Sequence, residues 1–255
     1  MGTGWGALSE THDFLGRLFD TDEQFPSPTD FVGSVHNSSA SQIAIYFQAT
    51  GPNLTASAGN YSFEQALMTA SLAAPAGDGP FFVLAADEYH PHLSPLFEPA
   101  SSAECPAADG GGALCLQYGF AASGLTISNS FFRRDDNTEQ VIAALIHALG
   151  GEAAIQADYG MLLAGIPAAC RGRATEQLKA FLAQSGFAAP VVDYRRLTGE
   201  FASASAVAAV MAIHWLQQGC IPPSLNGGDN STLTQKKALI IGFGPYVTSM
   251  EITAP

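Results

Sequence analysis

The sequence predicts an α/β protein, in which strands and helices alternate along the chain. Short apolar runs of strand length are separated by longer segments whose apolar residues recur at helical spacing. Glycine and proline stand at the boundaries between these segments, and the alternation extends through both halves. A chain of 255 residues is long enough to bury a sizeable core. We expect one domain, residues 1–255, with an N-terminal half (1–125) and a C-terminal half (126–255).

The N-terminal half is expected to contain two helices, two strands and one segment of undecided type. Residues 12–20 carry Phe14, Leu15, Leu18 and Phe19 at helical spacing, and the prolines at positions 26 and 28 end that pattern. The remaining segments are 42–51 (a short helix or a strand), 63–74 (a helix), 81–88 (a buried strand) and 110–120 (a second strand).

The C-terminal half begins with a helix predicted over residues 133–151. Acidic, Asn and Thr residues precede its periodic apolar segment, and a glycine pair follows it. Residues 203–219 predict a helix rich in small side chains, which Gly219 and two prolines close. Residues 236–252 predict two strands joined by a glycine turn.

Charge and composition exclude some classes of function. The net charge is −13, so the basic surface needed to bind nucleic acid or an anionic membrane is missing. Only 13% of the residues are charged, which fits either a surface partly covered by another subunit or a polar uncharged surface. The four cysteines are far apart, the N-terminus lacks a signal pattern, and no apolar run reaches about 18 residues. We expect a cytoplasmic protein without a membrane span.

Residues 51–67, GPNLTASAGNYSFEQAL, have the pattern of a strand that runs through a turn of small residues into a helix. Many enzymes place a nucleophile at such a turn, but the apex here is Asn60. Asparagine is a good helix N-cap, which explains it structurally. Ser62 could act as a substitute nucleophile, but no GxSxG motif and no base accompany it, so a helix-capping hydroxyl is preferred.

Histidines supply the remaining candidates. His36 and Asn37 are either polar residues of a channel or, as we prefer for His36, part of a turn satisfied by backbone groups. His90 and His92 follow Asp87 and Glu88 and could share a metal ion with them. Pro91 between them and the lack of a distant ligand favour a surface loop, so we predict no metal site. His147 and His214 lie in apolar helical patterns and are expected to be core or interface residues.

Four stretches together resemble the β-ketoacyl synthases of the thiolase superfamily. Residues 31–67 are similar to the segment that leads into the active-site cysteine, and ADGGGALCL resembles a later strand. LTGEFASASAVAAVMAIHWLQQGCIPP resembles the histidine-bearing turn and its helix, and IIGFGPYVTSMEI the closing strand pair. The matches occur in family order over about residues 5–252. The resemblance implies a thiolase-like layered αβαβα fold, shortened at the N-terminus and in the second half, and no cofactor.

The resemblance also implies that the catalytic residues are replaced. Asn60 stands where the family has its cysteine, Arg171 in CRGRAT where it has the first histidine, and Glu200 where it has the second, while Arg195 stands near the family's lysine. Condensation needs a nucleophile and two neutral imidazoles, and none of the three is present at these positions. Arg171 and Glu200 could instead form an ion pair.

These replacements resemble the chain-length factors of type II polyketide systems, and the SVHN motif resembles the small ketosynthase-like subunit of aryl polyene pathways. The implied role is a non-catalytic subunit that heterodimerises with an active β-ketoacyl synthase, with Tyr61, Phe63 and Phe243 as acyl-channel or interface candidates. Acyl carrier protein, which is acidic, would dock mainly on the active partner. The alternative is an independent acyl-thioester hydrolase or decarboxylase that uses Ser62, His36 or Glu200.

The resemblance begins where family members have already formed their first strands. We therefore expect a sheet with an exposed edge or an uncovered face, which a partner subunit could cover. A chain trimmed at its N-terminus would explain the same feature.

Overall fold

The computed structural model describes residues 1–73, 79–119, 124–225, 232–233 and 236–254. The chain has the predicted α/β class. It divides into two compact units, which we call the first unit (Met1–Tyr118 and Thr198–Ala206) and the second unit (Gly119–Leu197 and Val207–Pro255). We predicted one domain with a boundary between its halves at residues 125 and 126. That division stays a prediction.

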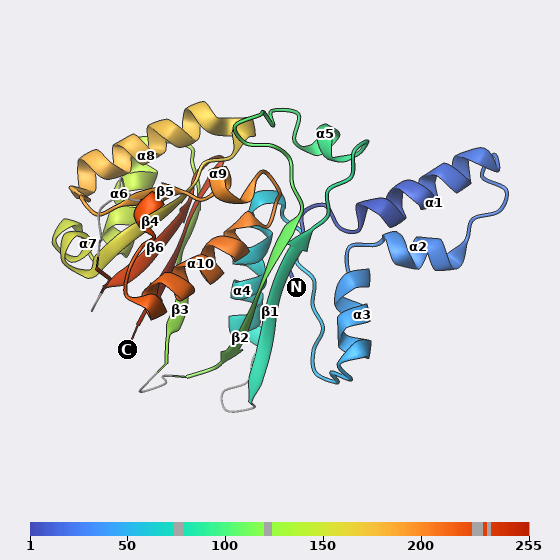
Figure 1. Ribbon diagram of the computed structural model, residues 1–255, viewed down its shortest axis with the longest axis horizontal. Coiled ribbons are helices and arrows are strands. Elements are labelled where there is room, and N and C mark those ends of the chain that lie inside the picture. The colour runs from blue at the N-terminus through green and yellow to red at the C-terminus, as the bar shows by residue number, and fades with distance from the viewer. Residues whose placement is uncertain (74–78, 120–123, 226–231, 234–235, 255) are drawn as a thin grey trace. The chain divides into compact units, whose positions relative to one another are not determined.

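The first unit contains the helices predicted near the N-terminus and after the asparagine turn (Figure 1). The undecided segment at 42–51 is helical up to residue 46. Ser27 caps the second helix by accepting the backbone N–H of Asp30. The elements are α1 (Leu8–Asp20), α2 (Pro28–Ser34), α3 (Ser38–Tyr46), a 3-10 turn (Gly59–Tyr61), α4 (Ser62–Ala73), β1 (Pro80–Asp87), α5 (Ser94–Phe97) and β2 (Gly110–Gln117).

β1 and β2 form an antiparallel ribbon, as the two predicted strands suggest. Gly2 forms a parallel bridge to Ala85 of β1 and a second parallel bridge to Ala56. The N-terminal segment therefore lies beside β1, and the segment at Ala56 lies beside the N-terminal segment. The prediction that 81–88 is a buried strand is wrong for one face: Val83 and Ala85 are buried, but Phe82 is 67% exposed. This agrees with the expectation of an uncovered sheet face.

The second unit is built around a five-stranded sheet in the order β3-β7-β6-β4-β5. β6, β4 and β5 are parallel to one another, whereas β7 is antiparallel to both β6 and β3. The elements are β3 (Thr126–Arg134), α6 (Thr138–Ala148), α7 (Glu152–Asp158), β4 (Tyr159–Gly165), α8 (Arg171–Ser185), β5 (Val191–Asp193), α9 (Arg195–Thr198), α10 (Ala204–Gln218), β6 (Lys237–Gly242) and β7 (Tyr246–Thr253). α10 begins in the first unit and continues in the second.

The predicted helix over 133–151 is shorter than expected. Its first two residues, Arg133 and Arg134, belong to β3, and α6 begins after Asn137, whose side chain accepts the N–H of Gln140. The helix at 203–219 and the strand pair at 236–252 are confirmed as α10 and β6–β7. Among the residues described, no single helix is long and apolar enough to cross a membrane, and the bent pair α6–α7 meets that criterion only when taken together.

α6 and α8 pack on the sheet of the second unit (Figure 1). Ile142 and Leu145 of α6 have no exposed surface, and neither do Leu239 and Ile241 of β6, which belong to the same cluster. Burying side chains of this size contributes about 1.5–3 kcal/mol each. This core holds α6 against the sheet to which the preceding strand, β3, belongs.

The carboxylate of Asp87 ties the first unit together. Its Oδ1 accepts bonds from Thr3 Oγ1 at 2.8 Å and from the backbone N–H groups of Gly4 at 2.7 Å and Trp5 at 2.8 Å. Its Oδ2 accepts the N–H of Ser203 at 2.7 Å. Because Asp87 is only 4% exposed, these donors replace the water that a carboxylate would otherwise need.

Replacing Asp87 with alanine is expected to lower the free energy of unfolding by about 3 kcal/mol, because buried donors lose their acceptor. Urea-induced unfolding followed by circular dichroism measures this change. Asp136→Ala is the control, since that side chain is 79% exposed and pairs with Arg134 at the surface. Equal unfolding midpoints for the two variants would contradict the role given to Asp87.

Tyr159 gives the second unit a dependence on alkaline pH. Its hydroxyl donates to Glu251. Burial, followed by that hydrogen bond, raises the pKa of Tyr159 above its ordinary value. A raised folded-state pKa means that the stabilisation is complete below the unfolded value near 10 and is lost as the pH rises above it.

We therefore expect the urea midpoint of the wild type to fall above about pH 10, and to fall less steeply in Tyr159→Phe. At neutral pH this variant loses about 1 kcal/mol through the missing hydrogen bond. Tyr118→Phe, at a position 52% exposed, should behave as the wild type. An identical alkaline decline in Tyr159→Phe would exclude this tyrosine as its source.

Candidate functional site

The candidate site lies at the turn that precedes α4, in the first unit. Asn60 is inside the 3-10 turn Gly59–Tyr61, so it precedes the helix by two residues and is not the residue immediately before it, as an N-cap would be. Ser62 has no exposed surface; its hydroxyl donates to Gly59 O at 2.7 Å and accepts the N–H of Ala58 at 3.0 Å. The predicted capping hydroxyl therefore holds the turn itself.

The N-terminal segment passes close to this turn and requires glycine. A Cβ atom on Gly2 would lie 2.4 Å from Ser62 O. A Cβ on Gly4 would lie 2.2 Å from the Cβ of Ala202 and 3.0 Å from the Cα of Gly59. Because no side chain fits there, the turn, the N-terminal segment and residues 199–205 pack backbone to backbone.

Glu200, at the position predicted for the second histidine, is a buried carboxylate with no exposed surface. The thiol of Cys105 donates to its Oε1 at 3.2 Å. The backbone of Glu200 also pairs with the same loop, through Pro106 O at 2.8 Å and Ala108 N at 3.0 Å. Sequence analysis missed Cys105 because 95 residues separate it from Glu200 and no spacing motif connects them.

A second buried carboxylate lies in the first turn of α4. Glu64 is 1% exposed, and its Oε2 accepts a hydrogen bond from the Ser205 hydroxyl at 3.0 Å. The positive end of the helix dipole favours an acidic side chain there. Sequence analysis did not single out Glu64, although an acid in the first turn of a predicted helix is a recognisable signal.

Neither the turn at residues 58–62 nor position 200 carries a cysteine or a histidine. The Asn60 amide cannot form a thioester, and the Ser62 hydroxyl is committed to the turn. Glu64 and Glu200 carry carboxyl groups, not the imidazoles that condensation uses to stabilise the developing oxyanion. That Asn60 and Glu200 stand where the family has catalytic residues stays a prediction.

Arg171 and Arg195 belong to the second unit. Arg171 lies 3.4 Å from Asp193 Oδ2, and burial raises the pKa of Asp193 while the Arg171 guanidinium opposes that shift. Arg195 is 1% exposed and stands 6.0 Å from the centre of the Tyr194 ring. Arg171 therefore has a carboxylate neighbour in its own unit, and its ion pair with Glu200 stays a prediction.

The channel candidates differ in exposure. Tyr61 is half-buried, whereas His36 and Asn37 at the start of α3 are exposed. Phe63 has no exposed surface, and Phe243 is 1% exposed within the core of the second unit. Their roles as acyl-channel or interface residues stay predictions.

The histidine loop after β1 has a neighbour that the sequence did not indicate. The His12 ring lies 4.5 Å from that of His90 and 5.5 Å from that of His92. The Nδ1 atom of His90 accepts two backbone N–H groups. No group of residues that could hold a metal ion occurs in the described part of the chain.

The core assignment of His147 and His214 is wrong, since both are exposed. Their apolar neighbours gave the helical periodicity, but the periodicity did not reveal which side faces solvent. The interface assignment stays a prediction.

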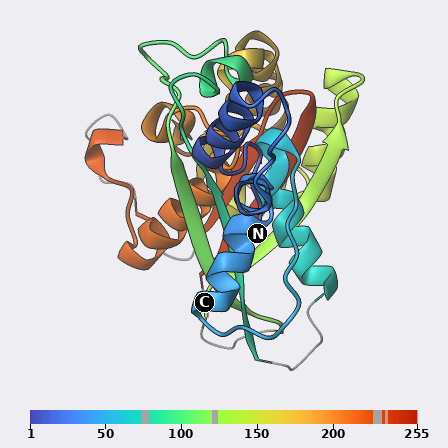
Figure 2. The same cartoon turned by 90° about the vertical axis from the view of Figure 1, so that its right-hand side faces the viewer.

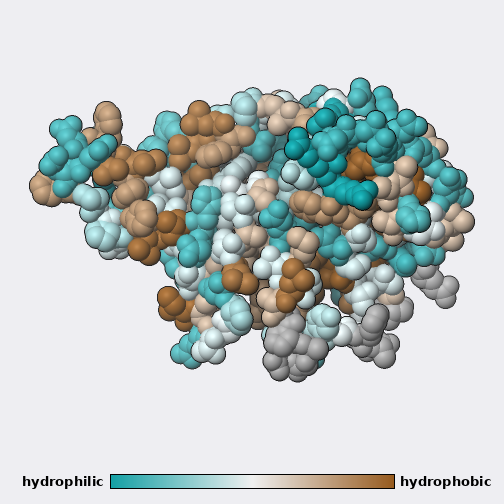
Figure 3. Space-filling model, turned by 180° about the vertical axis from the view of Figure 1, so that it is seen from behind, coloured by the Kyte–Doolittle hydropathy of each residue, from teal (hydrophilic) through white to brown (hydrophobic). Residues whose placement is uncertain are grey.

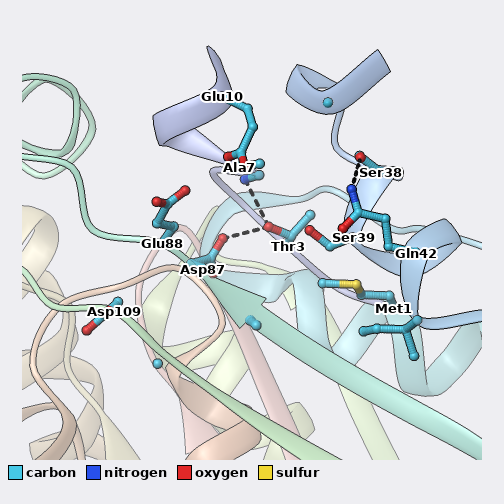
Figure 4. Close-up of a pocket in the computed structure, with 15 residues that line it drawn as sticks. Met1, Thr3, Ala7, Glu10, Ser38, Ser39, Gln42, Asp87, Glu88 and Asp109 are labelled. Carbon is cyan, nitrogen blue, oxygen red and sulfur yellow. Dashed lines mark hydrogen bonds between the residues drawn. The ribbon is translucent and has the colours of Figure 1, made fainter. Parts of the chain in front are cut away.

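A pocket of about 650 Å³ lies beside Asp87 in the first unit. Helices α1 and α3 and the ends of β1 and β2 line it, and Figure 4 shows Thr3 bonded to Asp87 at one side. Glu10, Glu88 and Asp109 surround it (Figure 4). An acidic pocket of this kind disfavours anionic ligands.

Comparison with known proteins gives a family and a fold. Residues 6–141, more than half of the chain, match the family described as beta-ketoacyl synthase, N-terminal domain. No curated protein matches the sequence.

The fold is similar to solved ketosynthase structures. A β-ketoacyl synthase from Burkholderia phymatum STM815 is 12% identical, with a TM-score of 0.73 over 100% of this chain and 74% of that one. The ishigamide ketosynthase/chain length factor is 18% identical, with a TM-score of 0.63 over 98% and 71%.

A third structure is a type II polyketide synthase acyl carrier protein in complex with its ketosynthase bound to the hexaketide. It is 16% identical, with a TM-score of 0.70 over 97% of this chain and 75% of that one. The fold is thiolase-like, as predicted, and the family match over residues 6–141 shows that this chain belongs to the β-ketoacyl synthase family.

Proposed function

We propose that this chain is a non-catalytic subunit that pairs with an active β-ketoacyl synthase and helps to shape its acyl channel in polyketide biosynthesis, of the aryl polyene type. The observation that carries the proposal is the turn before α4: Asn60 stands in it, Ser62 is buried and bonded within it, and position 200 holds a buried glutamate. A subunit with this site needs a partner that supplies the cysteine and the histidines.

Solved structures of the same fold support the assignment. One is described as a ketosynthase/chain length factor, and another contains an acyl carrier protein with its ketosynthase. The net charge of −13 and the acidic pocket favour docking of an acidic carrier protein on the partner rather than on this chain.

The first unit exposes apolar side chains that fit a partner subunit. Ile45, Tyr46 and Phe47 at the end of α3 are 72–82% exposed, and Phe19 and Phe25 near α2 are 80–82% exposed. Figure 3 shows hydrophobic residues on the part of the molecule formed by α1, α2 and α3, at the left of the view. Exposed apolar patches of this kind mark interaction sites.

Among the channel candidates, Tyr61 is the informative position. Phe63→Ala would leave a cavity in the core, and its cost in stability would obscure any effect on the product. Tyr61 is only half-buried, so its truncation tests product length more directly. The alternative of an independent hydrolase or decarboxylase gains no support from Ser62, which is buried and bonded to its own turn.

Co-expression with a full-length ketosynthase from the same pathway tests the pairing. We expect the two chains to co-purify as a stoichiometric complex, with its mass measured by light scattering. Ile45→Asp combined with Phe47→Asp should weaken the complex at least about tenfold, because charges would replace apolar contacts. Leu96→Asp, at a position 73% exposed on α5, is the matched control. A stable homo-oligomer that binds no ketosynthase would refute the proposal.

Restoring the cysteine tests the missing chemistry. In a Cys115→Ser, Cys220→Ser background, which removes the two exposed thiols, Asn60→Cys should react with iodoacetamide. It should still form no condensation product from acyl and malonyl thioesters, because Glu200 replaces an imidazole. Condensation above background by this single variant would show that the remaining machinery is intact and that the chain is a near-complete enzyme.

A further inference from the structure

Three histidines from two separate parts of the first unit lie in contact. His12 belongs to α1, whereas His90 and His92 belong to the loop between β1 and α5. The ring centres of His12 and His90 lie 4.5 Å apart, and the ring of His92 lies 5.5 Å from the first and 5.6 Å from the second. Figure 2 shows α1, in dark blue, beside the green segment that carries α5. The three rings therefore form part of the contact between α1 and this loop.

His90 holds the loop together as a hydrogen-bond acceptor. Its Nδ1 accepts the backbone N–H groups of His92 and Leu93, each at 3.3 Å. The hydroxyl of the buried Ser94 accepts the N–H of His90 at 2.8 Å, and the N–H of Ser94 donates to His90 O at 2.9 Å. A ring nitrogen that accepts N–H groups carries no proton, so the hydrogen of neutral His90 is on Nε2. Protonation places a second hydrogen on Nδ1 and removes the acceptor.

Protonation also brings like charges together. Two unit charges at the separation of these rings repel one another even in water. Within the described residues Asp13 is the carboxylate that lies against the cluster, with its Oδ1 3.5 Å from His12 Nδ1. Its side chain is 71% exposed, so solvent screens its attraction for the imidazolium. The cluster therefore contains more sites for positive charge than carboxylates to compensate them.

The other ionisable residues on the elements around the cluster have partners or positions of their own. They are Glu10, Arg17 and Asp20 on α1, Asp30 on α2, Asp87, Glu88 and Tyr89 after β1, and Glu98 after α5. Arg17 pairs with Asp30. Glu88 accepts the backbone N–H of Ser9 at 3.0 Å and also the Ser9 hydroxyl. The bonds from Ser9 attach the first turn of α1 to the end of β1 without using the histidines.

We propose that His12, His90 and His92 form a histidine latch, which holds α1 on the loop between β1 and α5 at neutral pH and opens below about pH 6.5. Loss of the acceptor on His90 opens the turn at residues 90–94, and repulsion between imidazolium rings separates α1 from it. The bonds between Ser9 and Glu88 keep the first turn of α1 in place. The opening is therefore local and leaves the rest of the first unit folded.

The latch also bears on the surface assigned to the ketosynthase. Phe19, 82% exposed near the end of α1, belongs to that surface. Opening of the latch displaces it, so pairing should be weaker at pH 5.5 than at pH 7.5. This consequence rests on the proposed function, whereas the latch itself is a property of the isolated chain.

The direction and size of the effect follow from the uptake of one proton. An open loop takes up a proton with the ordinary histidine value near pH 6.5, whereas the closed loop requires neutral His90. The stabilisation of the closed loop is therefore complete above that pH and is lost as the pH falls below it. Between pH 7.5 and pH 5.5 the ratio of open to closed forms should rise about tenfold.

Hydrogen exchange of the isolated full-length protein, followed by mass spectrometry at pH 7.5 and pH 5.5, measures this ratio. After correction for the intrinsic effect of pH on amide exchange, residues 8–20 and 88–97 should exchange about tenfold faster at pH 5.5. The strands β3, β4, β6 and β7 of the second unit should show no such increase.

His90→Asn is the decisive variant. The Oδ1 atom of asparagine can accept N–H groups two and three residues further along the chain, and it takes up no proton in this pH range. The corrected exchange should then differ less than about twofold between the two pH values. His90→Asp, which also retains an acceptor, is a second variant with the same expectation. His147→Gln, at an exposed position on α6, should keep the tenfold response. Equal thermal unfolding at pH 7.5 confirms that the variants are folded.

Four results would overturn the proposal. Corrected exchange of residues 8–20 and 88–97 is the same at both pH values, or rises equally in His90→Asn. An increase that extends through β3 to β7 would show a general loosening in acid. Protection of the loop by added Zn²⁺ at pH 7.5 would assign the three histidines to a metal site. Co-purification with the ketosynthase at pH 7.5 decides the proposed function separately, because the latch is closed at that pH.

Discussion

The buried carboxylate of Asp87 is the constraint on which the first unit depends. An ionised carboxylate inside a protein is tolerated only when donors surround it, and here every donor comes from a distant part of the chain. Residues 3–5 bind one oxygen and Ser203 binds the other. The N-terminal segment and the segment before α10 are therefore held on the end of β1, and the glycines at positions 2 and 4 allow both to meet the turn at residue 59.

The same framework holds the turn before α4. The turn is held by the Ser62 hydroxyl and by the backbone contact with Gly2, neither of which involves the side chain at position 60. A different side chain at position 60 would leave these contacts in place.

Helices and strands whose formation depends on neighbouring residues could be predicted from the sequence. Periodic apolar residues and capping signals indicated α1, α4, α6 and α10, and the glycine turn indicated β6–β7. The strand β3 was not predicted, because its segment SNSFF mixes polar and aromatic residues. Its last two residues, both arginines, were assigned to the start of the following helix. Exposure was harder to predict, since the helical periodicity around His147 and His214 does not reveal which face meets solvent.

The candidate site could be predicted only in part. The resemblance placed Asn60, Arg171 and Glu200, each from a motif in its own stretch of sequence. The contacts of Cys105 with Glu200 and of Asp87 with Ser203 join residues 95 and 116 positions apart, and no local signal announces such pairs. Long-range hydrogen bonds follow from the fold, so they become visible only with it.

The chain order shows that the first unit is completed by a segment from late in the sequence. A two-stranded ribbon is marginal in water, and β1–β2 gains neighbours from Gly2, Ala56 and α4. Residues 198–206, which follow most of the second unit in sequence, complete the first unit: Ser203 binds Asp87, and the Glu200 backbone pairs with residues 106 and 108. The first unit therefore forms all its contacts only after residues 119–197 of the second unit have been passed.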